Sequence, residues 1–226
     1  MAITVYTYND KVLKNVATDK WLKKKEGPNY NPYNLPAKTF RFKLGSSWSG
    51  DPSITVTQVE GDIYDVTFPS DSAINYFSKS AVTGLLGANG TGLTVVPSSL
   101  TSLTGTVGNL YLPDTTSLYS FFAGSSITSI GAIYAPNVTN INEMCNNNSY
   151  LTAVPDLYLN SITSCNNAFY GCINVESGAL ALYNKLAALG AQITAHNQTF
   201  AGCGSNTVTG AAELAQIPSS WGGTGA

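Results

Sequence analysis

Apolar residues after position 100 recur in two short phrases that share one period. The first phrase is fullest at residues 166–172, which read Asn-Asn-Ala-Phe-Tyr-Gly-Cys. Its apolar anchors are Phe122, Met144, Phe169 and Phe200, and the last interval between them is the longest. The second phrase is a tyrosine between apolar neighbours, at nearly equal intervals, and its copies are Tyr111, Tyr134 and Tyr158. Two phrases with a common period predict a solenoid, whose units bury their apolar faces only by stacking on one another.

Residues 38–86 show the two-residue alternation of β-strands, followed by a short helical pattern. Strands are expected at 39–44, 54–59 and 63–68, with turn residues between them. Consecutive strands with short connections favour an antiparallel meander. The apolar positions of residues 70–86 have helical spacing. We expect this antiparallel ββ(β)α unit to cap the solenoid, whose open end would otherwise expose an apolar layer and unpaired strand edges.

The C-terminal units depart from the period because they contain helices. Residues 177–190 predict a helix with Ser177 as its N-cap and Gly190 just after its C-terminus. A second short helix is expected at 208–216, and Trp221 is expected to cover the last unit. The predicted fold class is therefore α+β, a right-handed solenoid of about four to five repeats of ~23 residues with a cap at each end.

The chain divides into three predicted segments. Residues 1–37 are a basic N-terminal arm with a proline-rich linker, in which residues 12–22 have rough helical spacing. Residues 38–86 are the antiparallel capping subdomain. Residues 87–226 are the solenoid with its C-terminal cap of short helices.

Charge is sparse and unevenly distributed. Only 11% of the residues are charged, so neutral hydrogen-bonding side chains supply the surface, as is common outside the cytosol and in virion proteins. Residues 1–43 hold nine of the eleven lysines and arginines and three of the thirteen acids, which leaves the remainder acidic. The arm is either a solvated, chain-linking segment or a contact for an anionic partner. The acidic remainder offers no basic face to phosphate, which argues against a nucleic-acid partner.

Neither a membrane span nor a secretory signal is visible in the sequence. No segment approaches the about 18 apolar residues that cross a bilayer, so membrane insertion is not expected. The first residues lack the basic start, apolar run and cleavage site of a signal peptide. We expect an extracellular, cell-surface or virion-associated protein. It would leave the cell either through a signal that has been removed or as part of a particle.

With the phrases aligned, the chain resembles the BspA-type leucine-rich-repeat surface proteins of bacteria, in a gut-bacterial or phage-associated variant. Three stretches carry the resemblance: Asn-Val-Thr-Asn-Ile-Asn-Glu-Met at 137–144, Leu-Thr-Ala-Val-Pro-Asp-Leu at 151–157 and the phrase at 166–172. They match the family pattern Leu-Thr-x-Ile-Pro … Val-Thr-x-x-x-x-Met-Phe-x-Gly-Cys. The resemblance covers about residues 95–205 and implies a leucine-rich-repeat fold with a role in adhesion or host-surface recognition.

Residues able to perform catalysis are scarce. The single histidine, His196, has no nucleophile or orienting acid marked beside it. No pair of carboxylates occupies one point of the repeat, which argues against a glycosidase. The repeats also lack clustered Asp, Arg and Lys, which argues against a polysaccharide lyase. The glycine-rich run at 87–92 lacks the lysine of a phosphate loop and is predicted to be a turn. Asp62 and Asp65 could bind calcium, although hairpin turn chemistry accounts for Asp62. We therefore expect no catalytic residue, no cofactor and no metal, and hence no enzyme.

Four cysteines lie among the recurring phrases, at Cys145, Cys165, Cys172 and Cys203. Their irregular spacing fits no paired zinc knuckle. Cys172 and Cys203 share one position of the phrase, which Ser125 and Asn147 occupy in the other copies. Free, buried thiols in the interior are favoured over a disulfide.

Tyr111, Tyr134 and Tyr158 form the candidate ligand-binding face. If their apolar neighbours point inward, alternation sends all three tyrosines outward on one sheet face. The row could then stack on sugar rings or contact a protein, or its rings could pack only on one another. We expect a non-catalytic recognition or adhesion protein that binds a protein or glycan of a host or neighbouring cell. The alternative is a structural component of a phage tail or surface assembly, docked through the arm. The sequence leaves the oligomeric state open.

Overall fold

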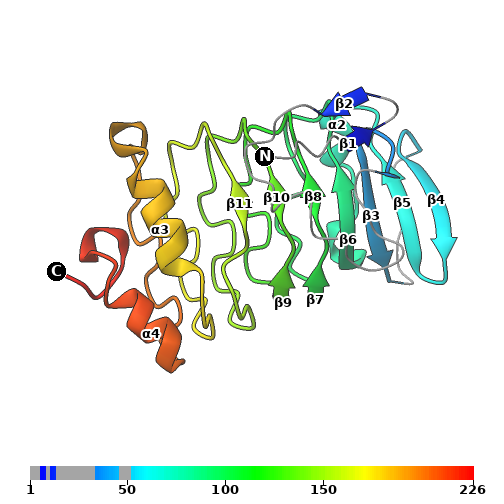
Figure 1. Ribbon diagram of the computed structural model, residues 1–226. Helices are drawn as coiled ribbons and strands as arrows, with labels where there is room; N and C mark the ends of the chain where they lie inside the picture. The colour runs from blue at the N-terminus through cyan, green and yellow to red at the C-terminus, as the bar shows by residue number, and fades with distance from the viewer. Residues whose placement is uncertain (1–5, 9–10, 14–33, 46–51) are drawn as a thin grey trace.

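One mixed β-sheet forms most of the structure, a computed structural model that describes residues 6–8, 11–13, 34–45 and 52–226. Its seven strands in chain order are β3 Thr39–Leu44, β4 Thr55–Glu60, β5 Ile63–Thr67, β6 Val82–Asn89, β8 Leu110–Tyr111, β10 Ile133–Tyr134 and β11 Leu157–Tyr158. Their spatial order is β11-β10-β8-β6-β3-β5-β4. Figure 1 shows this row, with β4 at one end and β11 toward the other.

The antiparallel half of the sheet contains the predicted strands in an unexpected order. Strand β3 turns Phe40, Phe42 and Leu44 into the core, as its alternation predicts. The predicted meander is wrong, because β5 pairs with β3 and β4 lies at the sheet edge. Burial explains the order: β5 buries Val66 completely, whereas the side chains of β4 are mostly exposed.

The helix predicted at residues 70–86 is also largely wrong. A four-residue helix, α2 (Asp71–Ile74), and a 3-10 turn, η2 (Lys79–Ala81), lead directly into β6. Residues 87–89, which the sequence predicts to be part of a turn, belong to this strand. The turn follows at Gly90, whose carbonyl accepts a hydrogen bond from Leu93 N at 2.9 Å. Pairing of β6 on both sides favours the strand, since neighbours on both edges supply its backbone hydrogen bonds.

The parallel half of the sheet consists of very short strands at the period of the tyrosine phrase. Strand β6 pairs with β8, β8 with β10, and β10 with β11, each in parallel. Leu110 N donates to Ala132 O and Ile133 N donates to Asp156 O, both at 2.9 Å. A second parallel pair, β7 (Thr104–Val107) with β9 (Ser126–Ile130), forms its own small sheet.

The predicted fold class is corrected by these pairings. In its described residues the protein is a mixed seven-stranded sheet with few helices, and not a leucine-rich-repeat-like right-handed solenoid with separate caps. The reason lies at β6, which pairs antiparallel with β3 and in parallel with β8. This double pairing joins the expected cap and the recurring phrases in one sheet over one hydrophobic core, from Phe40 to Trp221. The boundaries of the three predicted segments stay a prediction.

The first phrase is stacked in the structure, but one copy is shifted by one position from its predicted alignment. Phe122 N donates to Met144 O, and Cys145 N donates to Ala168 O, both at 2.8 Å. In parallel pairing this makes Cys145, and not Met144, the equivalent of Phe122 and Phe169. With this correction the first two intervals between anchors become nearly equal, and only the last interval is clearly longer.

Backbone conformation supports the corrected alignment. Two positions after each anchor the chain takes a positive φ, between 57° and 72°, at Gly124, Asn147, Gly171 and Gly202. Asn147 thus occupies a glycine position, which fits because asparagine tolerates the left-handed region better than most residues. It follows that Asn148, and not Asn147, is the equivalent of Ser125, Cys172 and Cys203.

Two helices, α3 (Ala179–Ala187) and α4 (Val208–Leu214), lie beyond β11 at the C-terminal end (Figure 1). Both were predicted, but the N-cap of α3 is Gly178 with φ 96° and not Ser177. Gly190 has a positive φ but begins a 3-10 turn, η3 (Gly190–Gln192). Trp221, in η4 (Ser219–Trp221), covers the last copy of the phrase as expected, since its carbonyl accepts from Phe200 N at 2.9 Å.

The N-terminal arm lies mostly outside the described residues. Strands β1 (Tyr6–Tyr8) and β2 (Lys11–Leu13) form an antiparallel pair. The helix indicated by the spacing of residues 12–22 is therefore wrong at residues 12 and 13, which belong to β2. The rest of that stretch and most of the proline-rich linker lie outside the described residues.

Candidate functional site

Tyr111, Tyr134 and Tyr158 lie side by side in three successive parallel strands and are named the tyrosine row here. Their sequence neighbours are all buried: Leu110, Leu112, Ile133, Ala135, Leu157 and Leu159. The tyrosines themselves are half-buried. Two-residue alternation therefore sends the three rings to the face opposite the core, as the sequence predicted.

The rings of the tyrosine row stack on one another. The centroids of Tyr111 and Tyr134 are 5.2 Å apart with an interplanar angle of 18°, and those of Tyr134 and Tyr158 are 4.9 Å apart at 12°. Both faces of the Tyr134 ring are therefore covered by its neighbours. The row presents ring edges rather than open faces, so the middle ring offers no platform for a sugar.

Each end of the tyrosine row meets a different element. At one end, Asn89 of β6 is the parallel-strand partner of Tyr111. Asn89 is buried, and its Nδ2 donates a hydrogen bond to Leu35 O at 2.7 Å. Beyond Tyr158 stands Lys185 of α3, whose Nζ lies 5.8 Å from the centroid of the Tyr158 ring. This distance is within the range of a cation–π contact. The row is thus bounded by a buried amide at one end and a cation at the other.

Lys185 is the functional candidate that the sequence did not reveal. Its ammonium donates to the carbonyl of Leu157 in β11. Burial against the strand lowers the pKa of Lys185, and the nearby Asp156 carboxylate opposes this shift. The sequence shows only a lysine in an amphipathic helix, and nothing in that pattern points to a strand 28 residues away.

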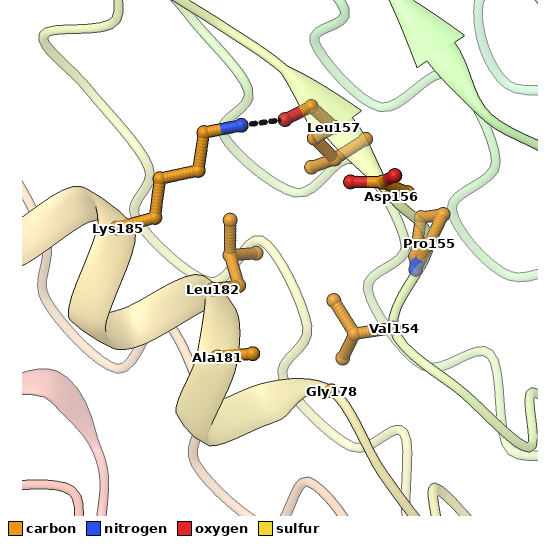
Figure 2. Close-up of a pocket in the computed structure, with 8 residues that line it drawn as sticks. All are labelled: Val154, Pro155, Asp156, Leu157, Gly178, Ala181, Leu182 and Lys185. Carbon is orange, nitrogen blue, oxygen red and sulfur yellow. Dashed lines mark hydrogen bonds between the residues drawn. The ribbon is translucent and has the colours of Figure 1, made fainter. Parts of the chain in front are cut away.

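A pocket lies between β11 and α3 beside this lysine. Its volume is about 240 Å³, and Figure 2 shows its eight lining residues. One wall comes from the chain around β11: Val154, Pro155, Asp156 and Leu157. The other comes from α3 and its N-cap: Gly178, Ala181, Leu182 and Lys185. The lining is apolar except for one acid and one base.

The environment of the tyrosine row also changes the acidity of its middle member. Burial raises the pKa of Tyr134, and the charge that Tyr158 acquires on ionisation raises it further. Tyr134 therefore keeps its proton at neutral pH. Its protonated hydroxyl can both donate and accept hydrogen bonds.

The single histidine occupies a structural contact. The His196 ring stacks on Trp221 with centroids 4.2 Å apart and an interplanar angle of 7°. Its Nδ1 lies 3.1 Å from the carbonyl of Ser220. These contacts hold the turn of η4 against the last copy of the phrase.

The acids considered for calcium have cationic partners. Asp65 pairs with Arg41 through two hydrogen bonds, of 2.6 and 2.8 Å. Asp62 lies 3.2 Å from Lys43 Nζ. Across the part of the chain that the structure describes, no group of three histidine, cysteine or acidic side chains is placed to hold a metal ion.

All four cysteines are free and buried, which confirms the prediction for them. Burial raises the pKa of every thiol, to about 11 for Cys165 and about 12 for Cys172. Cys172 Sγ donates to the Cys145 carbonyl at 3.0 Å. Because the thiolate is the reactive form, these cysteines are packing residues in the native state.

Comparison with known proteins identifies no relative: no family model, curated protein or solved structure matches the chain. Among the described residues, no helix is long and apolar enough to cross a membrane.

Proposed function

We propose that this protein is a non-catalytic recognition protein that binds a protein partner through the sheet face bearing the tyrosine row. The single observation that carries the proposal is the stacked, outward row of Tyr111, Tyr134 and Tyr158. Tyrosine is enriched in protein interfaces because it combines a large apolar surface with a polar hydroxyl. The sequence resemblance to bacterial surface proteins agrees with a role in adhesion at a cell or virion surface.

Ring geometry favours a protein over a glycan as the partner. A sugar stacks on an open aromatic face, and Tyr134 has neither face open. A polypeptide can instead contact a line of ring edges and hydroxyl groups whose ring centroids are 5.2 and 4.9 Å apart. That spacing is close to the ~4.8 Å between adjacent strands, so a peptide lying across the row meets one phenol per strand.

The test selects peptides from a random display library on the full chain and compares them with a glycan array. The key variant carries Tyr→Phe at 111, 134 and 158, which keeps the stacked rings and removes only the hydroxyl groups. A matched control carries Tyr76→Phe, since Tyr76 is the most exposed tyrosine among the described residues.

We expect peptides that bind the wild-type chain and the Tyr76 control equally and bind the triple variant at least about tenfold more weakly, a loss of about 1.4 kcal/mol. Circular dichroism checks that the triple variant is folded. The proposal would be overturned if the peptides bound the triple variant as tightly as the wild type. It would also be overturned if glycans bound the wild type and lost that binding in the triple variant.

A structural role in a phage tail or surface assembly is the second candidate, and charge asymmetry favours it. Residues 1–37 carry six of the eleven lysines and arginines, so an assembly with an acidic docking surface would attract this arm. Deleting residues 1–33 would then abolish incorporation into particles while leaving peptide binding by the tyrosine row intact. Incorporation that survives the deletion excludes docking through the arm.

A further inference from the structure

Strand β11 ends the seven-stranded sheet, and its outer edge faces α3. The carbonyls of Asp156 and Tyr158 accept from Ile133 N and Ala135 N of the neighbouring chain segment, at 2.9 and 3.0 Å. Backbone groups alternate in direction along a strand, so the N–H and C=O of Leu157 point the other way, toward α3. The Leu157 carbonyl is bound by Lys185 Nζ. The pocket therefore opens on a sheet edge that α3 covers only in part.

The Lys185 ammonium retains capacity for an anion. It has three N–H groups and donates one to Leu157 O. In the described part of the chain, no carboxylate lies within ion-pair distance of Nζ; Asp156 acts on it only from farther away. Lys185 is exposed overall, and its ammonium has no ion-pair partner among the described residues, so it can pair with the carboxylate of a ligand.

The remaining walls of the pocket suit a branched aliphatic group. Val154, Leu157 and Leu182 line it, and all three belong to the buried hydrophobic core, so the base of the pocket is apolar. Its volume of about 240 Å³ is below the ~300–1,000 Å³ of typical small-molecule sites. The pocket thus has room for one residue and not for a larger ligand.

We propose that this pocket binds one aliphatic amino-acid residue through its free α-carboxylate. The carboxylate pairs with Lys185, the branched side chain lies between Val154 and Leu182, and the α-nitrogen faces Asp156. A free amino acid and the C-terminal residue of a peptide share this chemistry. The proposal does not depend on the tyrosine row binding anything.

Calorimetry on the full chain with three probes tests the proposal. N-acetyl-leucine represents a peptide C-terminus, leucine represents a free amino acid, and N-acetyl-leucinamide lacks the carboxylate. We expect at least one of the two acids to bind with a Kd in the millimolar range or below, about −4 kcal/mol or better. The amide should bind at least about tenfold more weakly than N-acetyl-leucine, or not at all. Tighter binding of leucine identifies the free amino acid, and tighter binding of N-acetyl-leucine identifies a peptide terminus.

Two variants locate the binding and one controls for charge. Lys185→Met keeps much of the aliphatic stem and removes the ammonium, and Ala181→Phe fills the pocket from α3. Each should weaken binding of the better acid at least about tenfold, whereas Lys79→Met, a lysine outside the pocket, should not change it. Thermal melts verify that each variant folds. Absence of binding by both acids at about 10 mM, equal binding of acid and amide, or binding unchanged in folded Lys185→Met overturns the proposal.

Discussion

The ring of Tyr134 stacks on the ring of Tyr158 with their centroids 4.9 Å apart and an interplanar angle of 12°. The two residues belong to successive copies of the tyrosine phrase and lie directly opposite each other in β10 and β11. Their contact predicts that the tyrosine phrase stabilises the parallel half of the sheet.

A double-mutant cycle measures this contact. Tyr134→Ala and Tyr158→Ala should show a coupling of about 0.5–1.5 kcal/mol in the free energy of unfolding, because the double variant loses the stack once and not twice. Urea denaturation gives the four values. Tyr76→Ala, at an exposed site, should change stability by less than about 0.5 kcal/mol. Strictly additive effects at 134 and 158 would show that the stack contributes nothing.

The same pair predicts a change in acidity. Tyr158→Phe removes the charge that opposes ionisation of Tyr134, so the pKa of Tyr134 should fall toward its ordinary value of 10.0. It should not reach that value, because burial is the larger cause of the shift. NMR titration of 13C-labelled tyrosine rings follows the two residues separately. An unchanged pKa of Tyr134 in the Tyr158→Phe variant would contradict the assignment of part of the shift to Tyr158.

Glu213 of α4 caps the N-terminus of α3. Its carboxylate accepts from Leu180 N at 3.0 Å and from Gly178 N at 3.3 Å. Glu213→Ala leaves these amides without an acceptor and should cost about 1–2 kcal/mol of unfolding free energy. Chemical denaturation measures it, with exposed Glu176→Ala as the matched control. A cost equal to that of the control would mean that water replaces the cap.

The buried thiols predict loss of stability at high pH. The pKa of Cys172 is raised from 9.0 to about 12 in the folded protein, so the folded state keeps a proton that the unfolded state releases. This contribution is fully present below pH 9 and is lost as pH rises toward 12, by up to about 1.4 kcal/mol per pH unit for this thiol. The unfolding free energy of Cys172→Ala should therefore fall less steeply above pH 9 than that of the wild type. Equal slopes for the two proteins would be evidence against a shifted thiol.

Gly171 and Asn147 occupy equivalent positions in adjacent copies of the first phrase. A Cβ at Gly171 would lie 2.5 Å from Asn147 Oδ1, and the φ of Gly171 is +70°. Gly171→Ala should therefore cost about 2–3 kcal/mol, from backbone strain and from the clash. Adding Asn147→Gly should recover at least about 1 kcal/mol, because it removes the clash and suits the positive φ at 147. Thermal denaturation of the two single variants and the double variant measures these changes. If the double variant recovers no stability, the positive φ at residue 171 accounts for the whole loss, and the contact with Asn147 for none of it.

The shift of one phrase copy shows what a sequence period can and cannot reveal. Met144 is the apolar residue that best matches a phenylalanine, yet Cys145 occupies the equivalent position. Both side chains are completely buried, so hydrophobicity alone does not distinguish them. The positive φ at Asn147 does distinguish them, and asparagine at a glycine position was the one signal available in the sequence.

The sequence by itself determined the local features: alternation in β3 and β5, the outward direction of the tyrosines, both C-terminal helices and the buried thiols. Each depends on a residue and its near neighbours, and side-chain direction follows from a period of about 2 or 3.6 residues. The tertiary structure alone decided the order of β3, β4 and β5, the strand at β6 and the contact of Lys185 with β11. These depend on which distant segments supply hydrogen bonds and cover apolar surface. The double pairing of β6 therefore made one mixed sheet from parts that the local pattern had separated into a cap and a solenoid.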